Sequence, residues 1–484
     1  MHDVSLARKT AIALLFGTAA VLTLRTNALV APVQPRQHPL SAAAWRSAPG
    51  DYRVAADHIV GIDAFIGDNG ERMLLFSDYQ TGTVRRLFPT SGADYDAGPG
   101  FSQRSPIAFR VQFIEGQEHE HPSALRIVTA TGQTTIAARL PVEEQNVTFR
   151  SGHAVLAGTI LRSRSPATVA GIVLLHGSGP LTRYSFGPYP HFFASLGLAV
   201  LVYDKRGAGQ SNGDGMTASD YYPQPYTDDA VAAVRFLQSQ PGIRQASVGT
   251  WGSSEGGMLS TQLCARRPEP AFAINSSGFM EPLWQQMLYS IEAELEADGF
   301  SKPDANEARA LRQLQFDVGR TGSNWASLNK RQLSDRTRPW FDRYFEATTP
   351  SASVLRWRWQ HVYSFDPLVA LASARCPILG LFGSLDTSTP AKTSADTMRR
   401  ALRPSGGIRV EIEVFPNAGH PLAEVKSAAT SALEASPGMA PGVFSSIRNF
   451  ILESTPHHGE RSATKGRESV PNPTHAQTSH PAPL

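Results

Sequence analysis

Cysteine is scarce in this sequence. Only Cys264 and Cys376 occur among 484 residues, and neither has the closely spaced partners that a metal site requires. A framework of several disulfides is therefore excluded, as is a zinc cluster built on cysteine. We interpret the two residues as buried thiols at the edges of core elements, with one disulfide between them as the alternative in an oxidising compartment.

An excess of charge of one sign is also missing. The formal net charge is +3, and Lys and Arg are scattered along the chain rather than clustered. Proteins that bind nucleic acid carry a basic patch that meets the phosphates. The charge pattern therefore predicts no nucleic-acid partner.

The apolar run near the N-terminus is too short to span a membrane. It extends from Ala11 to Leu24, 14 residues, whereas a spanning helix needs roughly 20. Basic residues precede the run, and small residues follow it at Ala28 and Ala31, as in a secretory signal peptide. Residues 1–31 therefore predict an exported protein with no membrane span in its mature form; an uncleaved signal that anchors the chain is the alternative.

Two patterns divide the rest of the chain. Residues 50–142 hold short strand-like runs separated by Gly, Pro, Asp and Ser, which predicts a small all-β module. Its His119 and His121 lack further ligands and indicate a solvated turn rather than a metal site.

Residues 146–454 begin with a hairpin pattern and then alternate buried strands with helices, which predicts a parallel sheet with helices on both faces. Residues 455–484, rich in Pro, Ser, His and Thr, predict a disordered tail.

This alternation is interrupted by residues 279–373, which are helical in pattern. The segment contains five of the seven tryptophans of the chain. One interpretation is that the tryptophans form the core of a helical insertion. A second adds that the insertion is a lid over the carboxyl ends of the strands and gives a pocket its apolar wall.

The pattern G-x-S-x-G occurs twice, as GSSEG at 252–256 and as GQSNG at 209–213. Only the first lies between a predicted strand, ASVGTWG, and a predicted helix, EGGMLSTQL, as a nucleophile elbow requires. Ser211 in the second lies in a polar glycine loop and indicates a turn. Centring the pattern on Ser253 would need glycines at 251 and 255, so Ser254 is the candidate nucleophile.

A serine nucleophile needs an imidazole to take its proton and a carboxylate to orient the imidazole. In sheets that carry this elbow the acid and then the histidine follow the serine along the chain. Asp386 follows the strand pattern ILGLFG, and His420 follows IEVFP. Asp204 and Asp366 are rival acids, but the first precedes Ser254 and the second precedes its strand.

The negative charge on a tetrahedral intermediate needs two backbone donors. One is the N–H of Glu255, directly after the nucleophile at the start of its helix. The other is expected in HGSGP after the strand GIVLLHG, where Ser178 is preferred and Gly177 is the alternative. His176 is expected to shape this loop rather than to act as a base.

Five segments in this order, VLLHGSGP, VYDKRGAGQS, GTWGSSEGG, LFGSLDTSTP and FPNAGH, resemble the α/β-hydrolase superfamily. They are most similar to its serine-aminopeptidase-like and esterase-like branch, which has a helical lid. The resemblance covers residues 146–454. It implies an α/β-hydrolase fold and an acyl-enzyme mechanism that uses Ser254, His420 and Asp386.

We therefore expect an exported serine hydrolase that cleaves carboxylic esters of small molecules and uses no metal and no cofactor. A serine peptidase, an aminopeptidase or a thioesterase on the same fold is the alternative. A non-catalytic binding protein on a hydrolase scaffold is a further one. The sequence predicts no particular oligomeric state, and it assigns no role to the module at residues 50–142.

Overall fold

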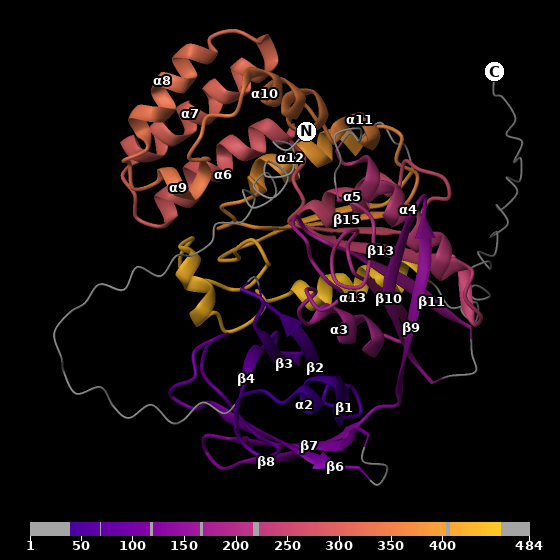
Figure 1. Cartoon of the computed structure of the whole chain (residues 1–484). Helices are drawn as coiled ribbons and strands as arrows, with labels where there is room; N and C mark the ends of the chain where they lie inside the picture. The colour runs from indigo at the N-terminus through magenta and orange to yellow at the C-terminus, as the bar shows by residue number, and fades with distance from the viewer. Residues whose placement is uncertain are drawn as a thin grey trace, which may run out of the picture.

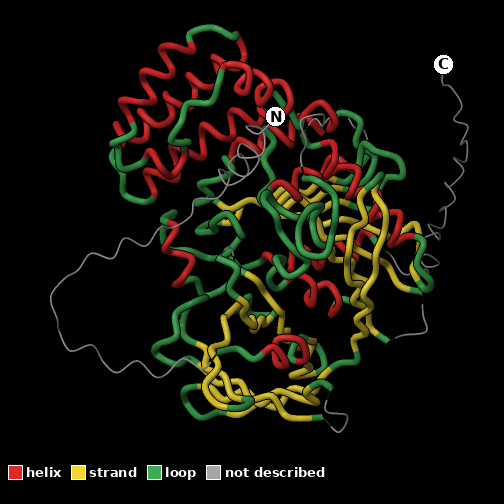
Figure 2. The backbone as a smooth tube through the Cα atoms, viewed as in Figure 1, coloured by secondary structure: helices red, strands yellow, loops and turns green. Residues whose placement is uncertain are grey.

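The computed structural model describes residues 39–67, 69–116, 120–164, 168–215, 222–402 and 407–455. The expected signal peptide, His119 and all of the expected tail except Thr455 lie outside these residues. The described chain forms a β-barrel, a mixed sheet flanked by helices and a separate group of helices (Figures 1 and 2). None of its helices is long and apolar enough to cross a membrane.

The barrel is formed by residues 50–139, after a short helix, α2 (Ala42–Ser47), that Ser41 caps. Each strand pairs with the next in antiparallel fashion, and β1 pairs with β8 to close the barrel. Apolar side chains such as Ile62, Leu74 and Val111 fill the interior. The strands are β1 (Gly50–Ala55), β2 (His58–Ile66), β3 (Arg72–Asp78), β4 (Val84–Ser91), β5 (Asp94–Ala97), β6 (Phe109–Glu115), β7 (Pro122–Thr129) and β8 (Thr134–Arg139).

The second sheet has eight strands in the order β16-β15-β14-β13-β11-β12-β10-β9. β9 and β10 form an antiparallel hairpin that begins at Val142, four residues before the expected start, because Val142–Gln145 continue to pair with β10. From β12 to β16 neighbouring strands are parallel. The strands are β9 (Val142–Ser151), β10 (Ala154–Ser163), β11 (Val169–Leu175), β12 (Ala199–Tyr203), β13 (Ile243–Ser253), β14 (Ala273–Ser276), β15 (Ile378–Gly383) and β16 (Val410–Phe415).

Helices cover both faces of this sheet, as the alternation of patterns predicted. Val173 and Leu175 of β11 pack with helices α4, α5 and α12, whereas Ile172 and Leu174 point to the other face and pack with α3 and α13. A strand buried on both faces reads as a continuous apolar run, which explains the sequence GIVLL. The flanking helices are α3 (Tyr189–Ser195), α4 (Gln224–Gln238), α5 (Glu255–Leu263), α12 (Ala391–Leu402) and α13 (Val443–Ser454).

The chain between β14 and β15 forms the group of helices, at the opposite end of the molecule from the barrel (Figure 1). The group has a core of its own, in which Trp340 and Phe341 are fully buried. Trp284 and Trp359 instead pack against the core that lies between the sheet and helices α4, α5 and α12. The group consists of α6 (Leu283–Ala297), α7 (Lys302–Thr321), α8 (Trp325–Asp335), α9 (Phe341–Tyr344), α10 (Ala352–Arg358), a π-helical turn (Trp359–Tyr363) and α11 (Leu368–Leu371).

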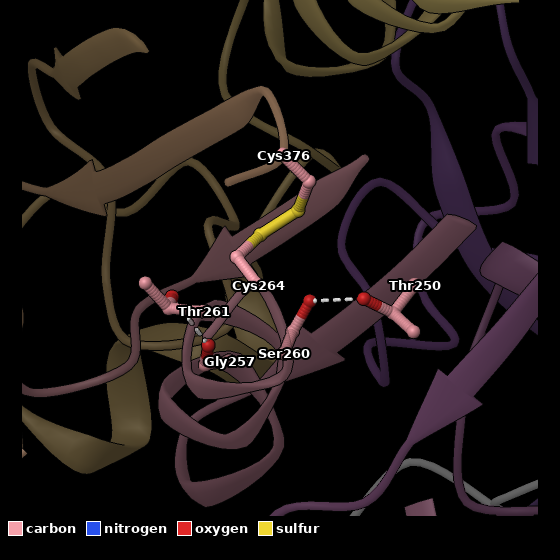
Figure 3. Close-up of a disulfide and its surroundings, with 6 residues drawn as sticks. All are labelled: Thr250, Gly257, Ser260, Thr261, Cys264 and Cys376. Atoms are coloured by element: carbon pink, nitrogen blue, oxygen red, sulfur yellow. Dashed lines mark hydrogen bonds between the residues drawn. A yellow bond between two sulfur atoms is a disulfide. The ribbon is translucent and has the colours of Figure 1, made fainter. Parts of the chain in front are cut away.

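Cys264 and Cys376 form a disulfide, so the interpretation as two free thiols is wrong (Figure 3). Cys264 ends helix α5, and Cys376 lies just before β15. The backbone N–H of Arg375 donates to the carbonyl of Cys264 at 2.9 Å, and the two cysteine Cα atoms are 5.1 Å apart, a separation that a disulfide spans. The bond joins residues 112 positions apart and encloses the whole group of helices.

Three buried ionisable side chains lie where the barrel packs against α3. Nδ1 of His191 is 3.6 Å from Asp51 of β1, and the backbone N–H of His191 lies 3.5 Å from Asp63 of β2. Burial lowers the pKa of His191, but the negative charge of Asp51 outweighs it, so the pKa rises to about 9. Burial raises the pKa of Asp63 to about 7. Burial also raises the pKa of Asp51, so His191 is buried beside two carboxyl groups of the barrel that both hold their protons more tightly than usual.

Candidate active site

Ser254 lies in the sharp turn between β13 and α5. Its backbone has φ 57° and ψ −120°, a conformation that costs free energy for any residue other than glycine. The flanking glycines allow the turn, because a Cβ on Gly252 would lie 2.1 Å from the carbonyl oxygen of Gly256. A Cβ on Gly256 would lie 2.1 Å from the carbonyl oxygen of Leu175 in β11. Ser253, by contrast, is still paired in the strand, opposite Ser276.

The other G-x-S-x-G match is a turn. Ser211 donates its hydroxyl to the carbonyl of Asp204 at 2.6 Å and accepts from the backbone N–H of Ala157 at 2.9 Å. The first hydrogen bond closes the loop after β12 on itself, and the second holds this loop against β10. The hydroxyl of Ser211 is therefore occupied in the structure of the loop.

Asp386 and His420 form a close pair beyond the carboxyl ends of β15 and β16. Nδ1 of His420 lies 2.8 Å from Oδ2 of Asp386 and 3.0 Å from Oδ1. The backbone N–H groups of Ser388 and Thr389 each donate to Oδ1 at 2.8 Å and fix the carboxylate. Burial lowers the pKa of His420, but the charge and hydrogen bond of Asp386 outweigh it, so the net shift is upward.

A short chain of hydrogen bonds leads from Ser254 to this pair. The N–H of Ser254 donates to the carbonyl of Ser276 at 2.8 Å, and Thr389 donates its hydroxyl to the carbonyl of the next residue, Ser277, at 2.8 Å. Nε2 of His420 is buried and has no hydrogen-bond partner among the described residues. With Nδ1 engaged by Asp386, Nε2 is the ring atom that can accept a proton from a hydroxyl.

The glycine loop after β11 runs beside Ser254. A Cβ on Gly177 would lie 3.6 Å from the Cβ of Ser254. The backbone N–H groups of Ser178 and Glu255 donate to no other residue in the described chain. Glu255 also begins α5, where the helix dipole favours negative charge. The two N–H groups, from the loop and from the helix, are the donors that an oxyanion next to Ser254 would need.

A buried ion pair that the sequence did not reveal joins these two elements. Nζ of Lys205 lies 2.6 Å from Oε1 of Glu255 and donates to the carbonyl of Gly177 at 2.9 Å. Ser178 donates its hydroxyl to Oε2 of the same carboxylate at 3.2 Å. Glu255 thus has a side-chain function as well as a backbone one. The signal was present as one charged residue, Glu255, among the small residues GSSEGG, but nothing in the sequence paired it with Lys205 of VYDKRGAGQS.

The rival acids and His176 have other partners. Asp204 forms a buried ion pair with Arg183 at 3.0 Å, and Asp366 accepts from the N–H of Leu368 at 2.9 Å. His176 stacks on Phe186 with ring centroids 4.3 Å apart, and burial lowers its pKa to about 3. It is therefore neutral and holds the loop against β12, where its Nε2 contacts the carbonyl of Tyr203.

Helix α6 of the helical group lies against the loop that carries Asp386. Tyr289 donates its hydroxyl to the carbonyl of Asp386 at 2.6 Å, and Gln286 donates to the carbonyl of Ser388 at 2.5 Å. Glu294, one turn farther along, adds negative charge that raises the pKa of His420. The residues that the structure describes include no group of three or more His, Cys, Asp or Glu side chains that could hold a metal ion.

Known proteins match parts of this chain. A thiohydrolase of Aspergillus aculeatus is 32% identical over 103 residues, which is 21% of this chain and 32% of that protein. A quorum-quenching protein of Acinetobacter baumannii is 29% identical over 165 residues, 34% of this chain and 54% of that protein. The chain thus spans about a third of one relative and about half of the other.

Solved structures and a family model also match. An esterase of Pyrococcus furiosus is 15% identical, covers 64% of this chain and 90% of its own, and has a TM-score of 0.39. The model described as the alpha/beta hydrolase family matches residues 172–432, more than half of the 484 residues, and confirms the resemblance read from the motifs. The chain therefore belongs to the alpha/beta hydrolase family.

Proposed function

We propose that this protein is an exported serine hydrolase that cleaves carboxylic esters of small molecules through an acyl-enzyme. One observation carries the proposal: Asp386 holds Nδ1 of His420 while Nε2 has no partner among the described residues. The loop of Asp386 is joined through Thr389 and Ser277 to the end of β14, the strand whose Ser276 accepts from the strained Ser254. Strain at a turn is retained where a function requires it. The family is one of hydrolases, which agrees with this chemistry.

In the proposed reaction Ser254 attacks the ester carbonyl while His420 takes its proton at Nε2. Asp386 keeps Nδ1 protonated and stabilises the positive charge that forms on the imidazole. The N–H groups of Glu255 and Ser178 bind the oxyanion, or that of Gly177 in place of Ser178. The alcohol leaves with the proton from His420, and a water molecule, activated in the same way, then releases the acid.

The helical group acts in this proposal as a lid. Its helix α6 touches the Asp386 loop through Tyr289 and Gln286, and its Trp284 and Trp359 pack towards the sheet. Aromatic walls suit acyl or aryl groups, which favours esters over peptides. A thioester is the second candidate because one relative is named a thiohydrolase.

Export is supported by the disulfide between Cys264 and Cys376, since such bonds persist in oxidising compartments. An exported protein recovered from outside the cytoplasm should begin directly after Ala28 or Ala31. A mature chain that retains residues 1–31 would instead indicate an uncleaved anchor.

The decisive experiment is labelling by a fluorophosphonate probe, which reacts with activated serines. The wild type should be labelled, Ser254→Ala should not, and the neighbouring Ser253→Ala serves as the matched control that keeps its label. No labelling of the wild type, or equal labelling of Ser254→Ala, would refute the serine mechanism.

The substrate class is tested with p-nitrophenyl esters of rising chain length, acyl thioesters and amino-acid p-nitroanilides. We expect the esters to have the highest kcat/KM. Faster hydrolysis of the anilides would make the protein a peptidase, and faster hydrolysis of the thioesters would make it a thioesterase.

A further inference from the structure

His420 lies on a long connection between β16 and α13 that has little regular structure of its own. Residues 416–442 make up this connection, which we call the histidine loop. In Figure 1 it is the yellow chain that runs between the barrel and the helical group. A loop of this length has many conformations, so something must select the one in which His420 meets Asp386.

The first layer of support lies within the loop. Val425 donates its N–H to the carbonyl of Asn417 at 2.7 Å, and Gly419 donates to the carbonyl of Ala423 at 3.0 Å. These two hydrogen bonds close a tight turn with His420 inside it. The position of His420 therefore depends on where residues 422–425 are held.

The second layer is the later part of the same loop. Glu424 donates its N–H to the carbonyl of Gly438 at 2.8 Å, and Ala440 donates to the carbonyl of Leu422 at 2.8 Å. Ala423 and Met439 form an antiparallel bridge between these two bonds. Residues 438–440 thus act as a short strand beside the turn that carries His420.

The third layer belongs to the barrel. Met439 donates its N–H to the carbonyl of Gly82 at 2.8 Å, and Thr83 pairs with Gly438 in an antiparallel bridge. Gly82 and Thr83 form the turn between β3 and β4. In addition, the backbone N–H of Phe101, between β5 and β6, donates to the carbonyl of Ser436 at 2.8 Å. A continuous ladder of backbone hydrogen bonds therefore leads from the barrel to the turn around His420.

Gly438 is the point of closest approach in this ladder. Its φ of +133° is one that side chains rarely adopt, and a Cβ there would lie 2.0 Å from the carbonyl oxygen of Gly82. Only glycine allows the loop to approach the barrel this closely. Any larger residue would push the two strands of the ladder apart.

The side chain of Arg85 in β4 contacts the histidine loop directly beside Gly438. Its guanidinium contacts the carbonyl oxygen of Pro437 and donates to the carbonyls of Gly98 and Val84 at 3.0 Å each. The side chain is buried, and its hydrogen-bond partners among the described residues are carbonyl oxygens rather than carboxylates. Burying a cation without an anion costs free energy, which these three carbonyls offset, and the one of Pro437 ties the guanidinium to the histidine loop.

We propose that the N-terminal barrel positions His420, with Arg85 and the contact between Gly82 and Gly438 as its means of doing so. The proposal rests on the proposed function, in which His420 is the base. Arg85 and Gly438 are positioning residues, because they act through the loop and touch neither Ser254 nor Asp386. The barrel is on this view an integral part of the active site rather than an appended binding module.

The test uses Arg85→Met and Gly438→Ala in the full chain. Each has a matched control elsewhere in the barrel. Arg139→Met removes an arginine that also donates to a backbone carbonyl, that of Pro49 at 2.6 Å. Gly132→Ala changes a glycine of φ +85° whose Cβ would meet nothing within 4 Å.

Two quantities are measured, the steady-state constants on a p-nitrophenyl ester and the amide hydrogen exchange of peptides that cover residues 417–425. We expect kcat to fall about 10- to 100-fold in both test variants, because small displacements of a catalytic group are costly, while KM changes about twofold or less. Exchange in 417–425 should be faster in both variants and unchanged in both controls. Arg85→Lys, which keeps the positive charge and one donor nitrogen, should recover part of kcat.

An unchanged kcat, a lower kcat without faster exchange in 417–425, or equal losses in Arg139→Met and Gly132→Ala would overturn the proposal. If Arg85→Met does not fold, Gly438→Ala and Arg85→Lys decide by the same criteria. Failure of the proposed function has a different signature, a wild type without hydrolysis that depends on Ser254. The exchange comparison then still decides whether the barrel holds the loop.

Discussion

Ser254 and His420 are held in place in contrasting ways. Ser254 is fixed by its immediate neighbours in sequence, a strand that ends at Ser253, a helix that begins at Glu255 and glycines on both sides. His420 lies on a loop whose supports are distant in sequence, such as Arg85, 352 positions before the carbonyl of Pro437 that it contacts. The comparison teaches that a short motif can specify the serine, whereas a second domain is needed to specify the histidine.

The largest effect is expected on the histidine side, from Asp386→Asn. The amide would favour the wrong tautomer of His420, so kcat should fall by about 10³–10⁴-fold while the fold is retained. Steady-state kinetics with a p-nitrophenyl ester measure it. Asp366→Asn, at the rival acid, is the matched control and should leave kcat unchanged. A normal kcat in Asp386→Asn would show that the two sides do not form one catalytic unit.

The disulfide provides the next test, on the serine side. Replacing Cys264 and Cys376 together by serine frees a segment of 112 residues in the unfolded state. The free energy of unfolding in urea should fall by about 2–5 kcal/mol. Because the bond lies at the far end of α5 from Ser254, kcat of the folded protein should not change. A lower kcat at full folding would mean that the serine side also depends on distant supports.

The ion pair of Lys205 and Glu255 is a support of the serine side between residues that are distant in sequence. Lys205→Met combined with Glu255→Gln removes both charges, so that no buried charge is left unpaired. We expect kcat to fall about 10-fold, because Ser178 and Gly177 lose their anchor beside the oxyanion. The double variant Arg206→Met and Asp229→Asn removes a nearby pair, 2.6 Å apart, as the control. Equal kcat values in the two double variants would contradict this role.

The smallest effect on kcat is expected from the interface between the barrel and α3, where the change is in stability. Folding raises the pKa of Asp63 to about 7 and that of His191 to about 9, so the folded state holds protons that the unfolded chain has released. The contribution of these two groups to stability is therefore greatest at low pH and declines as the pH rises towards 9, by up to about 1.4 kcal/mol per pH unit for each group within its range. Burial raises the pKa of Asp51 as well, which acts in the same direction.

Asp63→Asn should remove the part of this decline that lies below pH 7. The measurement is Tm by calorimetry across that range, with the exposed barrel residue changed in Asp57→Asn as the control. A slope of Tm against pH that is the same in Asp63→Asn as in the wild type would show that the carboxyl group of Asp63 is not perturbed by burial at this interface.

The sequence determined the family, the parallel sheet and the turn of Ser254. These follow from local patterns, because a strand buried on both faces reads as an apolar run and an elbow needs small residues at fixed spacing. It also ranked Asp386 above Asp204 and Asp366 by order along the chain. Each inference needed only residues close together in sequence, or the order of motifs.

Only the tertiary structure decided which distant residues meet. It joined Cys264 to Cys376, paired Lys205 with Glu255, and closed the N-terminal strands into a barrel whose β3–β4 turn and Arg85 reach the loop of His420. The physical reason is that backbone hydrogen bonds between loops leave almost no mark on residue identity, since every residue except proline carries the same donor and acceptor. Glycine is the exception, because two backbones can approach closely only where a Cβ is missing. In this protein Gly438 marks such a contact.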